Sequence, residues 1–431
     1  MKQTVQSARF WIALVVFSFT GQIAWVVENM YFNVFIYKMF HADASQISAM
    51  VAASAVTATL TTVLIGALSD KVGRRKLFIC GGYILWGISI ASFALLRMDV
   101  LTAAFPSAVS AAAVGVTLVI VLDCVMTFFG STANDACFNA WLTDATEGSG
   151  KRGAAEGINA MMPLLAIIAV FGGFMPFNLD LPESWTAIFL IIGGAVVIIG
   201  VLGIFFIHET PLKREENGHY FANIIYGFRP SVMRANPKLY GALAAFAVFG
   251  ISIQIFMPYL ILYYEVSLQM GNYVLVLAPA ILIAAAVTAV YGRVYDKIGF
   301  LPSLIPALIA LGTGYVVLYF CKGVLLVFVG SLLMMCGYLA GMAVFGAVIR
   351  DHTPVGKAGM FQGLRIVGQV LIPGIIGPVI GAAVLKNAET ITGNDGTVAF
   401  IPNENIFLAA LLAACFLIPI LFLLKRGKSS E

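Results

Sequence analysis

The chain has 431 residues, of which 61% are hydrophobic and only 11% are charged. A soluble globular protein has about 45–50% apolar and about 25% charged residues, so this composition excludes a soluble domain, a disordered chain and a coiled coil. Five of the six cysteines lie inside apolar runs and the sixth, Cys321, directly follows one, which excludes a secreted disulfide scaffold. The net charge is a small +4. The composition is that of a helical protein that crosses a membrane many times.

Twelve apolar runs are long enough to cross the hydrocarbon core, which is about 30 Å thick and requires about 20 helical residues. The first run is too long for a cleaved signal peptide. The fourth is longer than needed, and we expect it to continue beyond the membrane. The runs cover 10–37, 46–69, 77–96, 108–142, 154–175, 185–207, 239–264, 273–291, 305–320, 324–349, 360–385 and 406–424.

The basic residues orient these runs. If the N-terminus is cytoplasmic, the cytoplasmic segments hold twenty Lys and Arg residues and the opposite segments hold four. Such a bias is the positive-inside signature of membrane proteins. The sequence therefore predicts a multi-pass protein of the cell membrane, surrounded by lipid, with both termini in the cytoplasm.

The longest charged linker divides six runs from six. We expect an N-terminal six-helix bundle at 1–208, a cytoplasmic linker at 209–238 and a C-terminal bundle at 239–431. The two halves repeat a loop motif, because GALSDKVG (66–73) follows the second run and GRVYDKIG (292–299) follows the eighth. Duplicated bundles of this kind hold their substrate between the halves, near the middle of the membrane.

The segment GALSDKVGRRK (66–76) resembles the loop 2–3 signature of the major facilitator superfamily, and 292–299 resembles its second copy. The resemblance covers essentially the whole chain. It implies an all-α polytopic membrane protein with twelve transmembrane helices in two pseudo-symmetric six-helix bundles. Three shorter stretches, NAWLTDAT (139–146), QIAW (22–25) and FQGL (361–364), are similar to glycoside–pentoside–hexuronide:cation symporters and to the related sucrose-type symporters.

The resemblance implies that the repeated loops form a latch that holds the cytoplasmic side closed. Asp70 would face the positive N-terminal end of helix 11, which begins near Lys357, and Asp296 would mirror this contact against helix 5. The motif glycines would allow close approach and tight turns, and Arg74 or Arg75 would pair with Asp70 or with lipid phosphate. Alternatively, these charges only set the topology of a turn. The predicted latch residues are Gly66, Asp70, Gly73, Arg74, Gly292, Asp296 and Lys297.

Among the ionisable residues inside the predicted spans, three stand out, namely Glu28, Asp123 and Arg365. Each costs about 2.5–3.5 kcal/mol in a span and therefore faces a cavity or a partner. We predict that Asp123 and Glu28 couple transport to an ion, with Glu28 facing a neighbouring helix. Arg365 either pairs with an acid or contacts substrate. Asp135 falls on another face of helix 4, and we expect it to be structural.

Polar and aromatic residues share helix faces in the predicted spans. At 100° per residue, Asp123, Thr127, Asn134 and Trp141 align on helix 4, and Gln22, Asn29 and Asn33 align on helix 1. Polar side chains beside Trp or Tyr suit the hydroxyls and the apolar faces of a sugar ring. Alternatively, they only hold helices together. The predicted substrate-binding residues are Gln22, Trp25, Asn29, Asn33, Thr127, Asn134, Gln254, Tyr259 and Arg365.

The sequence thus predicts a secondary active transporter that moves a sugar or glycoside by alternating access, coupled to protons. Sodium coupling is disfavoured, because the resemblance implies acidic residues in helix 2 and the run 46–69 has only Ser, Thr and Gln as polar residues. A carboxyl taken out of water holds a proton more readily. The alternative is a proton antiporter that exports drugs or other amphipathic compounds, and a non-transporting sensor is a third class.

Enzyme functions find no support in the sequence. The four histidines are scattered, no paired cysteine motif gives a metal-ligand spacing, and no phosphate-binding loop is present. We therefore expect no cofactor, no metal and no nucleic-acid partner. The expected partners are a small-molecule substrate and the lipid bilayer, with the chain acting as a monomer.

Overall fold

Two units of packed helices make up the chain. The structure is a computed structural model that describes residues 7–105, 108–146, 151–208, 226–354, 358–392 and 398–426. Unit 1 contains Met1–Ala42, Val56–Gly218 and Thr392–Ala399, and unit 2 contains Asp43–Ala55, His219–Ile391 and Phe400–Glu431. The main division falls after Gly218, within the segment 209–238 that we predicted to be a linker.

The membrane spans agree closely with the apolar runs. In the described ranges, twelve helical segments are long and apolar enough to cross a membrane, and their limits lie within a few residues of most predicted runs. The eighth span differs most, since it continues to Ile298 instead of ending at 291. Its helix ends where Gly299 adopts a φ of +77°, a conformation that glycine reaches without strain.

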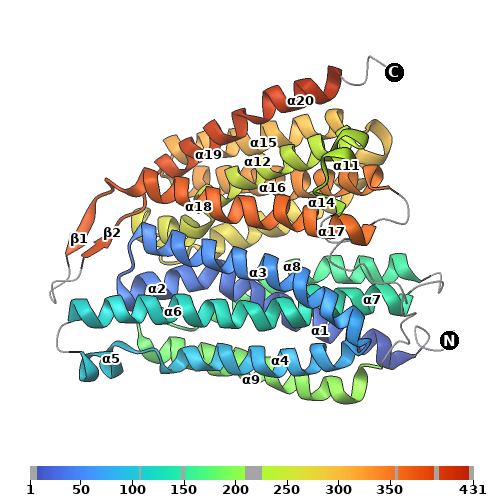
Figure 1. Cartoon of the computed structure of the whole chain (residues 1–431). Coiled ribbons are helices and arrows are strands. Elements are labelled where there is room, and N and C mark those ends of the chain that lie inside the picture. Colours follow the sequence, from blue (N-terminus) through green and yellow to red (C-terminus); the bar gives the residue numbers. More distant parts are fainter. Residues whose placement is uncertain are drawn as a thin grey trace. The chain divides into compact units, whose positions relative to one another are not determined.

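Unit 1 is built almost entirely of helices (Figure 1). Segments η1 and η3 are π-helical and η2 is a 3₁₀-helix, and the first part of α3 belongs to unit 2. The elements are α1 (Ala8–Val26), η1 (Val27–Tyr31), α2 (Phe32–Phe40), α3 (Ala44–Val72), α4 (Arg75–Ser92), η2 (Phe93–Leu95), α5 (Met98–Ala104), α6 (Ala108–Gly130), η3 (Ser131–Phe138), α7 (Asn139–Thr146), α8 (Arg152–Phe174) and α9 (Pro182–Phe206).

Unit 2 contains the remaining helices, and a two-stranded sheet of β1 (Thr390–Thr392) and β2 (Val398–Phe400) follows α18. Segments η5 and η6 are π-helical, and η4 is a 3₁₀-helix. The helices are α11 (Pro230–Ala235), α12 (Pro237–Phe256), η4 (Met257–Tyr259), α13 (Leu260–Leu262), η5 (Tyr263–Ser267), α14 (Val274–Ile298), α15 (Phe300–Phe320), α16 (Val324–His352), α17 (Ala358–Ile366), η6 (Val367–Leu371), α18 (Ile372–Leu385), α19 (Asn405–Cys415) and α20 (Leu417–Arg426).

Within unit 1, helices α4 and α9 lie side by side and approach closely through two glycines (Figure 1). A Cβ added to Gly87 would lie 2.5 Å from the carbonyl oxygen of Gly193, and one added to Gly193 would lie 2.6 Å from the carbonyl oxygen of Gly87. Helices in a membrane associate through such backbone contacts, because lipid removes the hydrophobic force between them. This reciprocal contact therefore fixes the distance between α4 and α9.

We expect Gly87→Val to destabilise unit 1, because the added side chain must push α9 away, and overpacking of this kind costs about 1–3 kcal/mol. The unfolding temperature of the purified protein in detergent measures this loss. Gly81→Val is the matched control, since it lies on the same helix and a Cβ there meets nothing within 4 Å. Equal unfolding temperatures for the two variants would show that the α4–α9 contact is not tight.

An ion pair in unit 2 joins the α15–α16 connection to the residue before α19. Lys322 Nζ lies 2.6 Å from Glu404 Oε2. Partial burial opposes ionisation of Glu404, but the hydrogen bond and charge of Lys322 and a backbone hydrogen bond together outweigh it, so the pKa of Glu404 lies below its usual value of 4.5. A carboxyl with a lowered pKa adds stability above the pKa it has when unfolded, and this stability disappears as the pH falls through the folded pKa.

We therefore expect wild-type protein to unfold at a higher temperature than Glu404→Gln at pH 7, and the difference to vanish as the pH falls below about 4. Thermal unfolding of both proteins in detergent across this range checks it. Glu389→Gln is the control, because Glu389 is exposed and forms no ion pair with a described residue. A difference that persists at low pH would contradict the assignment.

Candidate functional site

Polar side chains emerge from the middle of the first span. Trp25 lies near the centre of Ala8–Phe40 and is half-buried, as is Gln22, whereas Asn29 is exposed. The three residues follow one face of the helix, and Asn29 Nδ2 donates to the Trp25 carbonyl oxygen at 2.8 Å. Polar groups at this depth are costly in hydrocarbon, so we expect this face of unit 1 to meet water or a polar partner.

A hydrogen-bond network joins this face to η3. Tyr83 Oη lies 2.8 Å from the Phe17 carbonyl oxygen and 3.1 Å from Asn134 Oδ1, and Asn134 Nδ2 donates to Asp135 Oδ1 at 3.2 Å. A Cβ at position 21 would come within 2.6 Å of Asn134 Oδ1, so only glycine leaves room for the network. The network fixes the side chains at the centre of unit 1.

Glu28 and Asp123 form a second polar group in unit 1. Thr127 Oγ1 donates to Glu28 Oε1 at 2.8 Å, which confirms that Glu28 faces a neighbouring helix. Only 7% of Glu28 and 2% of Asp123 are exposed, and Asp123 lies one helical turn before Thr127 on α6. Two acidic residues thus lie enclosed in the membrane-spanning part of one unit.

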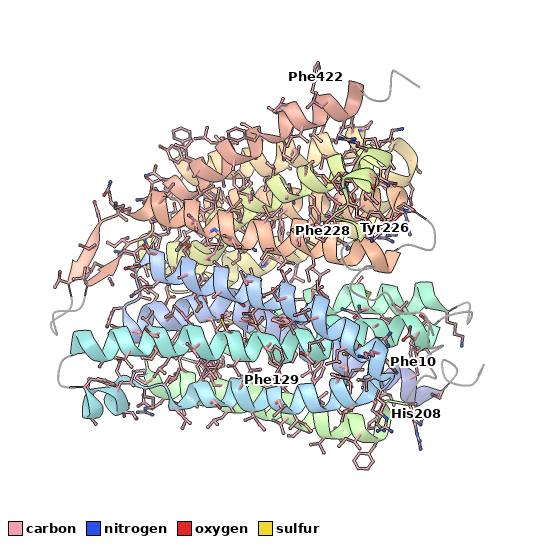
Figure 2. The ribbon with its side chains drawn as sticks, viewed as in Figure 1. Phe10, Phe129, His208, Tyr226, Phe228 and Phe422 are labelled. Atoms are coloured by element: carbon pink, nitrogen blue, oxygen red, sulfur yellow. The ribbon has the colours of Figure 1, made fainter. Side chains whose placement is uncertain are left out.

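The residues of the predicted helix 4 face contact the first span. Thr127 bonds Glu28, Asn134 lies against Gly21, and Trp141 packs on Phe10 at 5.4 Å between ring centroids. Trp141 is buried, also packs on Phe138 at 5.6 Å, and donates from Nε1 to the His208 carbonyl oxygen at 3.0 Å. Phe10 and His208 lie at the same end of unit 1, so Trp141 belongs to this end and not to the middle of the span (Figure 2).

Asn33 also departs from its predicted face. It is 1% exposed, and its Nδ2 donates to the carbonyl oxygen of Asn29 at 3.1 Å. The π-helix η1, which ends two residues before Asn33, changes the helical register between the two asparagines. The structure therefore does not bring Asn33 to the exposed face that carries Gln22 and Asn29.

In unit 2 the predicted substrate-binding residues Gln254, Tyr259 and Arg365 each have different neighbours. Gln254 is half-buried and packs against Gly377, and Tyr259 is fully buried with its hydroxyl donating to the Ala44 carbonyl oxygen at 2.9 Å. The predicted kink at Pro258 is present as η4. Arg365 is exposed, and its Nε donates to Gln369 Oε1 at 3.3 Å. In the described ranges Arg365 pairs with no carboxylate.

The repeated loop motifs contain equivalent turns. Gly73 has a φ of +70° and Gly299, at the same place in the second motif, has +77°, so both predicted tight turns require glycine. Gly66 differs from the expectation, because an added Cβ would meet only Ala136 Cβ at 4.0 Å and no backbone approaches closely.

The latch itself stays a prediction. The side chain of Asp70, the surroundings of Gly292 and the whole of Lys357 fall outside the parts that the structure describes. Asp296 and Lys297 are both exposed.

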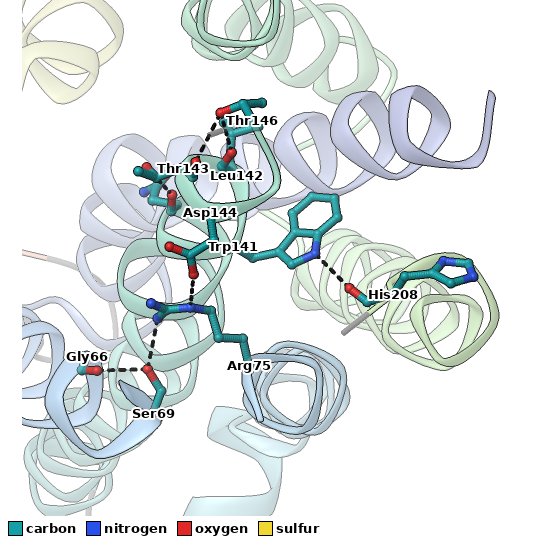
Figure 3. Close-up of polar contacts among 10 residues, drawn as sticks. Gly66, Ser69, Arg75, Trp141, Leu142, Thr143, Asp144, Thr146 and His208 are labelled. Carbon is teal, nitrogen blue, oxygen red and sulfur yellow. Dashed lines mark hydrogen bonds and ion pairs between the residues drawn. The ribbon is translucent and has the colours of Figure 1, made fainter. Parts of the chain in front are cut away.

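Arg75 holds the end of the fourth span. Its Nε lies 2.6 Å from Asp144 Oδ2, and its Nη1 donates to Ser69 Oγ at 3.3 Å (Figure 3). Ser69 in turn donates to the Gly66 carbonyl oxygen at 2.8 Å. Arg74, which the sequence favoured, is the exposed residue before α4. We call Ser69, Arg75 and Asp144 the loop clamp of unit 1.

Unit 2 repeats this contact with different chemistry. Tyr295 Oη donates to Asp351 Oδ2 at 2.6 Å. Tyr295 occupies the motif position of Ser69. Asp351 is the counterpart of Asp144, because DAT (144–146) and DHT (351–353) form a second repeat at the ends of the fourth spans. Each unit thus fastens its loop motif to the acidic residue that follows its fourth span. The sequence contained the two acids as a repeat, but it did not indicate which side chains would bind them.

The described residues form twelve spans in two units with repeated loops, and one span carries a polar face at its middle. These features together are those of a multi-pass membrane transporter. The family model described as Major Facilitator Superfamily matches residues 10–378, and the chain belongs to this family. It is a transporter with the fold of alternating-access carriers, and not an enzyme. A comparison with curated proteins finds none that matches.

Solved structures share the fold at low sequence identity. A nucleoside transporter, NupG, in a point-mutant form, has a TM-score of 0.70 and 12% identity, covering 96% of this chain and 98% of that one. A bacterial homologue of the human lysosomal transporter Spinster, inward-facing and occupied, has a TM-score of 0.71 and 14% identity, covering 96% of both chains. Its unoccupied form has a TM-score of 0.70 and 14% identity, covering 97% of this chain and 98% of that one.

Proposed function

We propose that the chain moves a sugar or glycoside across the cell membrane by alternating access, in symport with protons. The observation that supports this most is the polar face at the centre of the first span, formed by the half-buried Gln22 and Trp25 and the exposed Asn29. Amide groups bind hydroxyls, and an indole covers the apolar face of a sugar ring. A lipid-like cargo would need an apolar face instead.

Proton coupling is supported by Glu28 and Asp123. Acidic residues enclosed in membrane spans are the usual proton carriers of transporters. Both carboxyls are buried, and Glu28 accepts from Thr127, one helical turn after Asp123. Sodium requires several oxygen ligands, and the resemblance to sodium-coupled symporters implies acids in helix 2, where 46–69 has none. The positive-inside bias supports cytoplasmic termini.

Transport into proteoliposomes tests the proposal. Labelled sucrose, methyl β-galactoside and uridine are offered with an imposed pH gradient, with a sodium gradient and with neither. We expect a sugar to accumulate only under the pH gradient. Accumulation under sodium alone contradicts the coupling, and accumulation of uridine without either sugar contradicts the cargo. Export of hydrophobic dyes supports the alternative antiporter, and no transport at all supports a sensor.

A further inference from the structure

An apolar groove in unit 2 lies between α12, α18 and the last span, which α19 and α20 form. Its volume is about 560 Å³, and all ten residues that line it are apolar. Val248 and Ile251 belong to α12 and Ile376 to α18, whereas Leu412 and Phe416 come from the last span. Leu412 and Phe416 are 57% and 68% exposed, so the groove is open and not an enclosed cavity.

The groove lies where the last span changes from one helix to the next. Helix α19 ends at Cys415 and α20 begins at Leu417. Pro419 has no N–H to donate to the Cys415 carbonyl oxygen, so a continuous α-helix would lack a hydrogen bond at this place. Helix α18 contacts α19 but diverges from α20 (Figure 1). The divergence leaves the groove between these helices.

The groove lies at the depth of lipid chains. Val248, Ile376 and Leu412 each belong to a helical segment that is long and apolar enough to cross a membrane. An open surface in such a segment faces hydrocarbon, and pockets that hold small ligands have volumes of about 300–1,000 Å³. The lining has no polar side chain, so it offers no hydrogen bond to a polar solute. The acyl chain of a lipid fits these properties.

Two arginines lie at the end of unit 2 where α12 begins. The segment before α12 crosses the ends of α12 and α17, because Tyr226 packs on Phe361 at 5.9 Å and Phe361 packs on Tyr240 at 6.4 Å between ring centroids. Tyr226 and α17 lie at the same end of unit 2 (Figure 2). Arg229 lies over the Tyr226 ring at 5.8 Å. Arg229 and Arg234 are exposed, and within the described ranges neither forms an ion pair with a carboxylate.

The distance from this end to the groove matches the length of a lipid chain. At 1.5 Å per residue, Val248 and Ile251 lie about 12 and 17 Å beyond Tyr240 along α12. Half of the hydrocarbon core, which one leaflet fills, is about 15 Å thick. Ala244 shares the helix face of Val248 and Ile251 and is exposed, so only a small side chain lies on the path between.

We infer that the groove binds one acyl chain of an anionic phospholipid whose phosphate pairs with Arg229 and Arg234. Negative headgroups gather at basic residues beside membrane spans, and arginine binds phosphate through two parallel N–H groups. Phe228 and Met233, beside the two arginines, are 43% and 45% exposed and supply apolar contacts at the membrane boundary. The inference concerns a lipid site and does not depend on the cargo or on the coupling ion.

Native mass spectrometry of the purified protein in detergent tests the site. Dioleoyl phosphatidylglycerol and dioleoyl phosphatidylcholine are offered together, and the lipid retained by each protein molecule is counted. We expect about tenfold more phosphatidylglycerol than phosphatidylcholine, because each basic residue near the headgroup contributes about fivefold. Phosphatidylglycerol should also raise the unfolding temperature. Glycerol 3-phosphate, which has the charge but no acyl chain, should leave it unchanged.

Two variants address the two parts of the site. Arg229→Gln/Arg234→Gln removes the charges, and we expect the preference for phosphatidylglycerol to fall below about threefold. Ala413→Phe places a large ring in the groove, because Ala413 is one of the lining residues, and we expect it to reduce retention of phosphatidylglycerol at least about fivefold. Unfolding temperatures without lipid show whether each variant is folded.

The control variants make the same changes on α14. Arg293→Gln/Lys297→Gln removes two exposed charges and Ala289→Phe enlarges an exposed alanine, so both should bind lipid like the wild type. Equal losses in the controls, or none in Arg229→Gln/Arg234→Gln, overturn the inference. So does a loss of the preference in Lys386→Gln, because the exposed Lys386 follows the other end of α18. Stabilisation by glycerol 3-phosphate alone would assign the arginines to a soluble anion and also overturn it.

Discussion

Asp123→Asn is expected to abolish the accumulation of cargo against its gradient while leaving downhill equilibration intact. The asparagine keeps the size of the enclosed side chain but cannot carry a proton, so cargo movement no longer draws on the pH gradient. We expect the accumulation ratio in proteoliposomes to fall at least tenfold, to about unity. Glu28→Gln should act in the same direction, because Glu28 lies in the same polar group.

Asp135→Asn provides the contrast for this result. Asp135 is half-exposed and belongs to the network of Asn134 and Tyr83, so its substitution should raise KM while saturating cargo still accumulates. Counterflow exchange of labelled against unlabelled cargo separates the two effects, since exchange needs binding but no proton gradient. Full accumulation by Asp123→Asn at wild-type levels would remove Asp123 from coupling.

The second large effect is expected at the loop clamp of unit 1. Arg75→Gln leaves the Asp144 carboxylate without its positive partner. The pair is mostly buried, since only 10% of the Arg75 side chain and 26% of the Asp144 side chain are exposed. Removing one partner of a fully buried ion pair lowers the free energy of unfolding by about 3–5 kcal/mol. Because this pair is only partly buried, we expect a loss of about 2–3 kcal/mol. A large fall in unfolding temperature and in yield should follow.

The double variant Arg75→Gln/Asp144→Asn should recover much of this loss, because it removes both charges together. Arg74→Gln is the control, since Arg74 is exposed and adjacent in sequence. A double-mutant cycle on unfolding temperatures in detergent measures the coupling between the two positions. If Arg75→Gln and Arg74→Gln behave alike, the clamp does not stabilise unit 1.

Hydropathy was sufficient to predict the twelve spans, because the length of an apolar helix is set by the thickness of the membrane and not by tertiary contacts. The tight turns at Gly73 and Gly299 were predictable for a similar reason, since a positive φ depends on one residue. The choice between Arg74 and Arg75 was not predictable. It depends on where α4 begins, and Arg74 precedes the helix while Arg75 is its first residue.

The face of helix 1 was predicted only in part, because the sequence gives no sign of η1. A regular period places Asn33 with Gln22 and Asn29, whereas the π-helix changes the register between the two asparagines and Asn33 is buried. The bonds of Asp135 to Asn134 and Ser131 also needed the structure, because no periodicity contains them.

The wide turn η3 also has a mechanical consequence. A π-turn holds one more residue than an α-turn, so tightening it would rotate α7 about its own axis by about 100° relative to α6. Asn134 and Asp135 lie inside η3, whereas Asp144, which pairs with Arg75, lies beyond it in α7. Such a rotation would carry Asp144 away from Arg75. The ion pair therefore opposes the rotation and keeps η3 in its wide form.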